Sequence, residues 1–311
     1  MKTFLKNSIK FLLPYGAVLL AVVTWALFIE IRLYYSKIRV SADIRYIVVG
    51  DSQSEMAIAP AYFPCLANHS IAGLSLDQSL YKIRDLLSTN ADRDFTIILD
   101  VSPRRMLHGD QPLAASDFES RYALLNFIHF FSSRRKIGEP IIILRDRIVK
   151  SAFNHLTHRK FTKKRNKLSK NPWGGFQARS EKRWLSNPEE TANEARQYIS
   201  ESLKEAASST ETVAHNMAIL EEIITTVKAN GKEIILLTTP WHGSLLDGLS
   251  QKLITPFSAN MQMLADQHGL KWLNTIEWHT PDEGWLNQNH LNASGAILYT
   301  TYLREQIVKE N

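Results

Sequence analysis

Short apolar runs separated by helical patterns constrain the fold of this 311-residue chain more than any other feature. Residues 44–50, 95–99 and 233–240 are rich in Ile, Val and Leu, as strands buried on both faces are. Shorter segments at 65–71 and 271–274 predict two more strands. Apolar residues recur at helical spacing over 75–89 and 191–229. Strands that alternate with helices predict an α/β fold with a parallel, doubly wound sheet.

Three polar residues follow the first predicted strand. Gly50 ends the apolar run, and Asp51 and Ser52 come next, where the chain turns into a helix. In an open α/β sheet, this carboxyl edge is where ligands bind. A serine here presents its hydroxyl to a substrate, while helix N-terminal N–H groups face any negative charge that develops. A purely structural interpretation also fits, in which the turn only supplies an Asp or Ser helix cap.

A second polar stretch, residues 285–296, places His290 just ahead of a helix expected at 293–308. A serine hydroxyl is a weak nucleophile at neutral pH and needs a base to take its proton. Histidine suits that task, because its unperturbed pKa lies near 6.5. The pair predicts Ser52 as nucleophile and His290 as base.

These stretches resemble the sequence blocks of the SGNH (GDSL) hydrolase superfamily. The matching blocks are Gly50-Asp-Ser52, Asn68-His-Ser-Ile-Ala-Gly73 and His290-Leu-Asn-x-x-Gly295, within residues 44–110 and 232–308. The resemblance implies a flavodoxin-like three-layer α/β/α sandwich and serine esterase chemistry. It also implies that the N–H groups of Ser52 and Gly73 form the oxyanion hole.

The sequence departs from that family at two positions. The acid that orients the histidine is expected three residues before it, where this chain has Asn287. Asn287 can hold the imidazole ring but brings no charge, and Asp282 or Glu283 is a possible substitute. The family's third oxyanion donor, an Asn, is also missing. Ser102 or Arg104, after the third predicted strand, is the replacement we expect.

The N-terminus predicts a membrane anchor. Residues 11–29 are uncharged and almost wholly apolar, which is long enough to span a bilayer as a helix. No small-x-small cleavage site follows, so residues 1–31 are interpreted as an uncleaved signal anchor, 32–43 as a connector and 44–311 as the SGNH-like domain. Positive charges flank both sides of the span and leave its orientation open. The chain looks most like the membrane-tethered bacterial branch that includes envelope acyltransferase proteins of the alginate and teichoic-acid systems. That resemblance implies a single-pass protein of the bacterial inner membrane with a periplasmic catalytic domain.

Residues 111–231 are interpreted as a helical insertion with a basic segment. Residues 145–183 hold thirteen Lys or Arg against Asp146 and Glu181, although the whole chain has a net charge of only +6. This segment is a solvated charged loop, a contact for anionic lipid headgroups, or a contact for an anionic glycan or another membrane protein. Nucleic acid is not an expected partner, because no binding motif accompanies the charge.

No metal or cofactor is expected. The ten histidines show no convincing ligand spacing, and no Gly-rich phosphate loop is present. The predicted function is a membrane-anchored serine esterase or O-acetyltransferase for acyl esters of a cell-envelope polysaccharide, whose partners are the acylated glycan or acyl donor. The alternative is a catalytically impaired scaffold that binds glycan or docks an integral-membrane acyltransferase.

Overall fold

The structure, a computed structural model, describes most of the chain outside its N-terminus and a central segment. The described residues are 13–18, 20–22, 24–25, 28, 32, 35–36, 38–107, 175–176 and 188–308. The chain divides into two units, residues 1–38 with 113–172 and residues 39–112 with 173–311. Most of the basic segment 145–183 lies outside the described residues.

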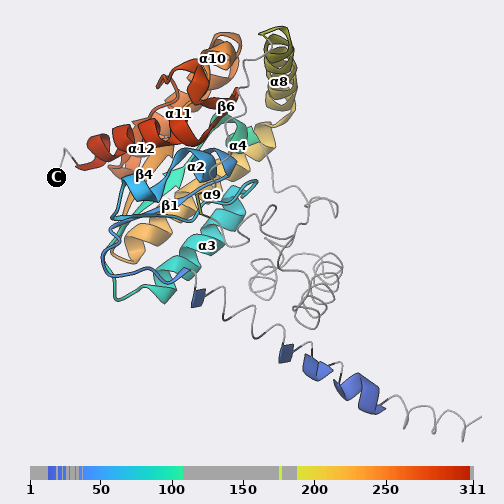
Figure 1. Cartoon of the computed structure of the whole chain (residues 1–311), viewed down its shortest axis with the longest axis vertical. Coiled ribbons are helices and arrows are strands. Elements are labelled where there is room, and N and C mark those ends of the chain that lie inside the picture. Colours follow the sequence, from blue (N-terminus) through green and yellow to red (C-terminus); the bar gives the residue numbers. More distant parts are fainter. Residues whose placement is uncertain are drawn as a thin grey trace, which may run out of the picture. The chain divides into compact units, whose positions relative to one another are not determined.

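The second unit is built on a parallel five-stranded sheet in the order β2-β1-β3-β4-β5 (Figure 1). The strands are β1 (Tyr46–Val49), β2 (Leu66–Asn68), β3 (Thr96–Asp100), β4 (Glu233–Thr238) and β5 (Lys271–Asn274). This is a doubly wound order whose switch point lies between β1 and β3. The prediction of a parallel α/β fold is confirmed, and the segments that follow β1 and β3 meet at the edge where ligands bind.

Helices cover both faces of the sheet. The helical segments are α2 (Ser52–Ala57), η1 (Pro60–Tyr62), α3 (Leu76–Thr89), α4 (Pro103–Leu107), α8 (Pro188–Ser208), α9 (Thr210–Ala229), α10 (Gly243–Leu249), η3 (Ser250–Ile254), α11 (Thr255–His268), η4 (Asp282–Gly284) and α12 (Ala293–Val308). Their ends follow local sequence rules. Ser75 and Gln78 form a capping box at the start of α3. Gly231, with a φ of 69°, allows the reversal after α9.

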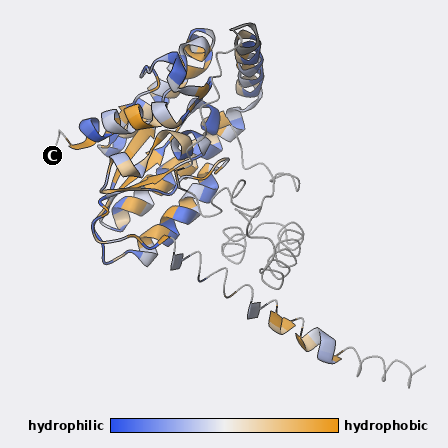
Figure 2. Ribbon diagram, viewed as in Figure 1, coloured by the Kyte–Doolittle hydropathy of each residue, from blue (hydrophilic) through white to orange (hydrophobic). Residues whose placement is uncertain are grey.

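Alternate strand residues point to opposite faces, so each strand contributes to two cores. Val48, Ile98 and Leu237 belong to a buried cluster with Tyr299 and Leu303 of α12. Their strand neighbours therefore face α3 and α9, which lie on the other side of the sheet (Figure 1). Strands β1, β3 and β4 are accordingly apolar over most of their length (Figure 2).

Helix α9 falls within the range 111–231 that the sequence suggested as an insertion. It is the crossover helix between β3 and β4, and it packs against both α3 and β4. Four of its side chains are fully buried: Leu220, Ile223, Ile224 and Val227. The end of that range is thus part of the central α/β sandwich.

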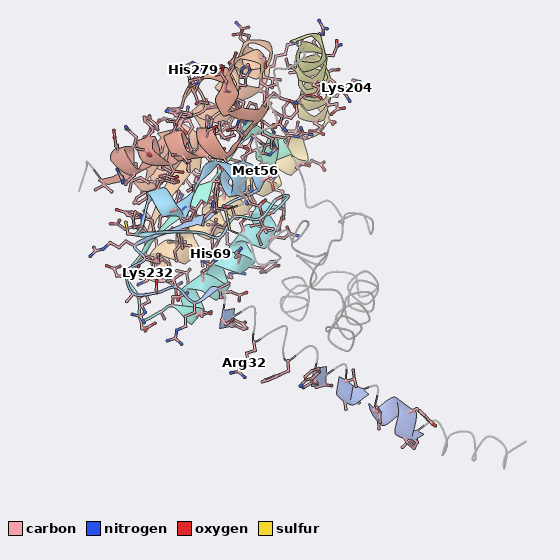
Figure 3. The ribbon with its side chains drawn as sticks, viewed as in Figure 1. Arg32, Met56, His69, Lys204, Lys232 and His279 are labelled. Carbon is pink, nitrogen blue, oxygen red and sulfur yellow. The ribbon has the colours of Figure 1, made fainter. Side chains whose placement is uncertain are left out.

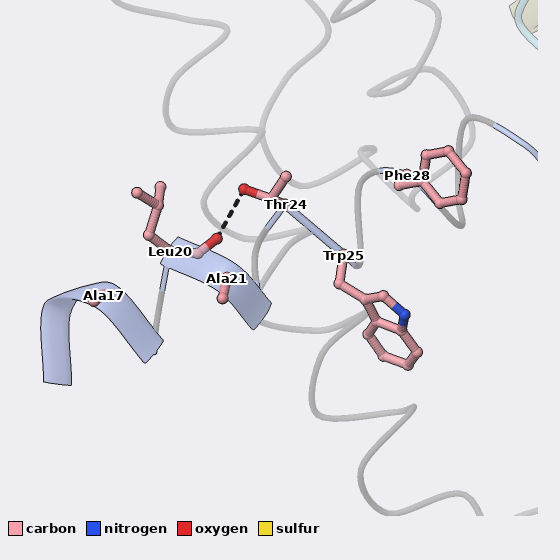
Figure 4. A pocket seen from close by; sticks show the side chains of 6 residues that line it. All are labelled: Ala17, Leu20, Ala21, Thr24, Trp25 and Phe28. Carbon is pink, nitrogen blue, oxygen red and sulfur yellow. Dashed lines mark hydrogen bonds between the residues drawn. The ribbon is translucent and has the colours of Figure 1, made fainter. Parts of the chain in front are cut away.

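In the first unit, most of the described residues between positions 13 and 28 are apolar and exposed. Six of them line a shallow pocket along one helical face: Ala17, Leu20, Ala21, Thr24, Trp25 and Phe28 (Figure 4). The Thr24 hydroxyl donates to the Leu20 carbonyl at 2.8 Å. The predicted span 11–29 lies only partly inside the described residues, and among these residues no helix is both long and apolar enough to cross a membrane.

Candidate active site

Ser52 is the first residue of α2, directly after the central strand β1. Asp51 caps this helix, and its carboxylate accepts the Gln53 N–H at 2.8 Å. Gly50 is required for the close packing of the turn. A Cβ there would lie 2.1 Å from Ser54 Oγ and 2.5 Å from Asp100 Cβ, both far too close. The Gly-Asp-Ser sequence therefore brings the β1–α2 turn tightly against β3 and holds Ser52 at the sheet edge.

His290 reaches Ser52 from the far end of the sequence. Its Nε2 lies 2.8 Å from Ser52 Oγ, and its Nδ1 lies 3.0 Å from Asn287 Oδ1. Asn287 and His290 are paired across a small hairpin of β6 (Trp285–Asn287) and β7 (His290–Leu291), joined by a two-residue turn. The three-residue spacing in the sequence thus places both residues beside the turn of one hairpin.

The hydrogen bonds assign the tautomer of His290. The Asn289 backbone N–H donates to Asn287 Oδ1 at 3.2 Å, so the atom at that position is the amide oxygen. An oxygen accepts, and the facing Nδ1 of His290 must therefore carry the proton. Its Nε2 is then left with a lone pair directed at the Ser52 hydroxyl, which is the arrangement that a general base requires.

Asn292 and Gly295 of the closing block hold the hairpin in place. Asn292 Oδ1 accepts the N–H groups of Ser294 and Gly295 and caps α12, while its amide donates to the carbonyls of Glu283 and Trp285. A Cβ on Gly295 would lie 2.0 Å from the Gly284 carbonyl oxygen. The block therefore needs a glycine because two backbone segments touch there.

The structure corrects the predicted substitutes for the orienting acid. The Asp282 carboxylate lies 3.3 Å from Nε2 of a different histidine, His242. The Glu283 side chain is exposed, and its carbonyl serves Asn292. The partner of His290 Nδ1 is the neutral Asn287, because the tight hairpin turn brings that residue, and not η4, beside the ring.

The predicted oxyanion donors lie on neighbouring segments. Gly73 sits in a turn closed by the Leu74 N–H on the Ile71 carbonyl, and its φ of 74° explains the glycine. The Ile71 N–H donates to the Gly50 carbonyl at 3.0 Å, which ties this turn to the β1–α2 junction. Ser52 is the first residue of its helix, where the N–H has no intrahelical acceptor. Both N–H groups therefore belong to the same sheet edge.

Ser102 has a different role from the predicted one. Its hydroxyl accepts the Arg105 N–H at 3.2 Å at the start of α4, and its side chain is buried. The Arg104 guanidinium lies 4.4 Å from the ring centroid of Tyr198 on α8. Helix capping and a cation–π contact thus account for both predicted third donors, since each side chain is engaged by its own neighbours.

Asp100 is a buried carboxyl directly behind the site. Burial, together with the nearby Asp51 carboxylate, raises the pKa of Asp100 to about 7, although Arg105 opposes the rise. Arg105 donates to the Asp100 carbonyl and to the Ser79 hydroxyl. The Asp100 side chain packs against Gly50, where an added Cβ would lie 2.8 Å from its Oδ2.

Sequence reasoning missed a second buried ionic group. Lys82 of α3 is fully buried and donates to the carbonyl of His69, which is labelled in Figure 3. Burial lowers the pKa of Lys82 to about 7, and the Glu55 carboxylate of α2 acts in the opposite direction. Burial and the neighbouring Lys82 lower the pKa of His69 to about 3, so its imidazole is neutral. A lysine within an amphipathic helix pattern gives no signal that it points inward.

No group of three His, Cys, Asp or Glu side chains that could hold a metal ion occurs among the described residues.

The sequence matches no protein-family model and no curated protein. Two solved structures are similar to the chain in outline. One, from Bacteroides fragilis NCTC 9343, is provisionally assigned as an acylhydrolase; it is 9% identical with a TM-score of 0.40, and the match covers 86% of each chain. The other is a GDSL-like lipase from Bacteroides thetaiotaomicron VPI-5482, 9% identical with a TM-score of 0.41, covering 88% of this chain and 92% of that one. Similarity at this level carries neither an activity nor a substrate from those proteins to this chain.

Proposed function

We propose that this chain is an SGNH-type serine acyl-ester enzyme, either an esterase or an O-acyltransferase. The observation that supports the proposal is the hydrogen-bonded series Ser52–His290–Asn287. Ser52 Oγ and His290 Nε2 are 2.8 Å apart although 238 residues separate them. In the assigned tautomer, the lone pair of His290 Nε2 points at the Ser52 hydroxyl, and this is the geometry of an activated nucleophile.

The chemistry is acyl transfer through a covalent intermediate. Ser52 Oγ attacks the ester carbonyl carbon as its proton passes to His290 Nε2. The N–H groups of Ser52 and Gly73 face the oxyanion of the tetrahedral intermediate. The C–O bond to the alcohol then breaks, and His290 returns the proton to the leaving oxygen. Water, or a sugar hydroxyl in a transferase, releases the acyl group by the reverse sequence.

Asn287 limits the rate of this chemistry. Its amide oxygen orients the ring but supplies no negative charge to stabilise the imidazolium that forms. In serine proteases, replacing the triad Asp by Asn costs about 10⁴ in turnover because the wrong tautomer results. Here the Asn289 N–H prevents that error, since it forces the amide oxygen toward His290. We therefore expect a slow but functional site.

The setting that we propose is the bacterial cell envelope. The apolar run 11–29 would anchor the chain in the inner membrane, with Ser52 in the periplasm, and the substrate would be an acylated polysaccharide or another acyl donor. An integral-membrane acyltransferase is a fitting partner. The basic segment 145–183 would contact anionic lipid. The length of the apolar run and the local charge support this setting.

A second candidate function is a scaffold that binds glycan without turning it over. The neutral Asn287 favours it, as does the use of the Ser102 hydroxyl in a helix cap instead of an oxyanion hole. The two functions differ in whether Ser52 is reactive.

A serine-directed fluorophosphonate probe separates these candidates. The full-length chain should be labelled at Ser52 and should hydrolyse p-nitrophenyl acetate, and Ser52→Ala should lose both activities. Ser208→Ala, an exposed serine on α8, is the matched control and should behave as the wild type. A wild-type chain that neither reacts with the probe nor cleaves the ester would support the scaffold function.

A further inference from the structure

Tyr198, on the inner face of α8, is held rigidly beside the candidate site. Its side chain is only 7% exposed. One edge contact with Trp241, at 6.1 Å and 88°, and the Arg104 guanidinium at 4.4 Å fix the ring from two directions. Burial raises the pKa of the Tyr198 phenol above its ordinary value, so the hydroxyl is neutral at physiological pH. Its oxygen is therefore a fixed, uncharged hydrogen-bond acceptor.

The Tyr198 hydroxyl contacts the turn of the β6–β7 hairpin. The Asn289 amide Nδ2 donates to it at 3.3 Å. The other turn residue, Gln288, accepts the His242 backbone N–H at 3.0 Å through its carbonyl. The two-residue turn is thus held by two hydrogen bonds, one from the Asn289 side chain to Tyr198 of α8 and one from the His242 backbone to Gln288.

The position of Asn289 matters because its backbone N–H orients Asn287. That N–H donates to Asn287 Oδ1, and Asn287 Oδ1 accepts from His290 Nδ1 at 3.0 Å. We propose that Tyr198 is a positioning residue for His290. It holds Asn289 so that the Asn287 amide cannot flip. The lone pair of His290 Nε2 then stays directed at the Ser52 hydroxyl. This inference rests on the proposed serine chemistry. It also assigns to α8, which precedes the crossover helix, a part in the reaction.

A neutral orienting residue makes this support necessary. An Asp in place of Asn287 would present an acceptor whichever way it turned, whereas an amide presents an acceptor on one side and a donor on the other. A flipped Asn287 would direct NH₂ at Nδ1 and select the tautomer with the proton on Nε2. That tautomer cannot accept the Ser52 proton. The hydrogen bond that Asn289 donates to Tyr198 compensates for this weakness of the amide, which an Asp at position 287 would not have.

The test uses Tyr198→Phe and Asn289→Ala in the full-length chain, with Tyr62→Phe as the control for loss of an exposed tyrosine hydroxyl. The first readout is the second-order rate of fluorophosphonate labelling of Ser52 between pH 5 and 9. The second is ¹⁵N NMR of the imidazole nitrogens, with the His290 signals assigned by His290→Gln. This measurement reports the tautomer whether or not the protein is active.

We expect Tyr198→Phe and Asn289→Ala each to slow labelling about three- to tenfold, as loss of one neutral hydrogen bond does. The double variant should be no slower than the worse single variant, because both act through one contact. The Nε2–H tautomer of His290 should increase in both variants and not in Tyr62→Phe.

Unchanged labelling and an unchanged tautomer in Tyr198→Phe would overturn the inference, even if the melting temperature fell, because the hydroxyl would then serve stability alone. Additive effects in the double variant would also overturn it. If the wild-type Ser52 does not react at all, the proposed function fails. The tautomer measurement would still decide whether Tyr198 orients His290.

Discussion

Two histidines near the hairpin have similar partners and different surroundings. His290 contacts Ser52 and the neutral Asn287, whereas His242 contacts Ser244 and the acidic Asp282. By residue type alone, His242 has the more complete Ser-His-Asp set. Its geometry shows that it serves a different purpose.

His242 Nδ1 accepts the backbone N–H of Ser244 at 3.2 Å, at the start of α10. The Ser244 hydroxyl, 2.9 Å from the same nitrogen, lies two residues away in a local turn. His242 therefore closes a helix end. His290 contacts Ser52, which comes from the opposite end of the domain in sequence and lies at the carboxyl edge of the sheet. The difference teaches that a set of residue types becomes a candidate active site only where the fold leaves the serine at a ligand-binding edge.

The largest expected effect separates the two histidines directly. His290→Ala should slow fluorophosphonate labelling of Ser52 by about 10²–10⁴-fold, since the general base is lost. His242→Ala should slow it less than about threefold, because the backbone N–H that holds Gln288 remains. Labelling rates at pH 7.5 measure both. Equal losses in the two variants would contradict the assignment of the base.

Adding a charge beside His290, and removing one beside His242, tests the comparison further. Asn287→Asp should raise the rate of ester hydrolysis by about tenfold or more, by stabilising the imidazolium that forms on His290. The acid limb of the pH–rate profile should move to higher pH, because a nearby carboxylate favours the protonated ring. Asp282→Asn, at His242, should leave the profile in place. A shift of the profile by Asp282→Asn would mean that this acid acts on His290 after all.

The β6–β7 hairpin, which carries His290 and accepts the His242 backbone N–H, lies next to a close backbone contact between Gly284 and Gly295. Gly295→Ala places a methyl group 2.0 Å from the Gly284 carbonyl oxygen, so backbone must move at an expected cost of about 1–3 kcal/mol. Urea unfolding gives that free energy. Gly243→Ala, where a Cβ meets nothing within 4 Å, is the matched control and should not destabilise the fold. Equal stability of the Gly295→Ala variant and the wild type would mean that α12 and η4 are not packed so closely.

The smallest effect concerns the buried carboxyl behind Gly50. Folding raises the pKa of Asp100 from 3.8 to about 7, so between these values the folded protein binds more protons than the unfolded chain. The contribution of Asp100 to the free energy of unfolding therefore falls as pH rises from about 4 to about 7. Asp100→Asn should reduce the change in unfolding free energy between pH 6 and 8 by on the order of 1 kcal/mol. Urea unfolding at the two pH values measures it, with Asp92→Asn, an exposed carboxyl, as control.

The chain's local patterns predicted most of the α/β architecture. The predicted strand segments overlap β1 to β5, with β3 extending one residue beyond its predicted segment, and the expected closing helix 293–308 coincides with α12. Buried strands and amphipathic helices leave such patterns because burial selects apolar residues at regular spacing. The inward-pointing Lys82 and the contact between Tyr198 and Asn289 left none, since each depends on which distant surface lies opposite.

The sequence by itself determined the motif residues of the site and the departure at Asn287, because both are matters of residue type and spacing along one strand end and one hairpin. Only the tertiary structure decided which groups serve them. It paired Asp282 with His242, used Ser102 as a helix cap and placed Tyr198 on the hairpin turn. The physical reason is that a hydrogen bond is specific to distance and direction, and residues far apart in the chain acquire these only when the sheet and its helices pack.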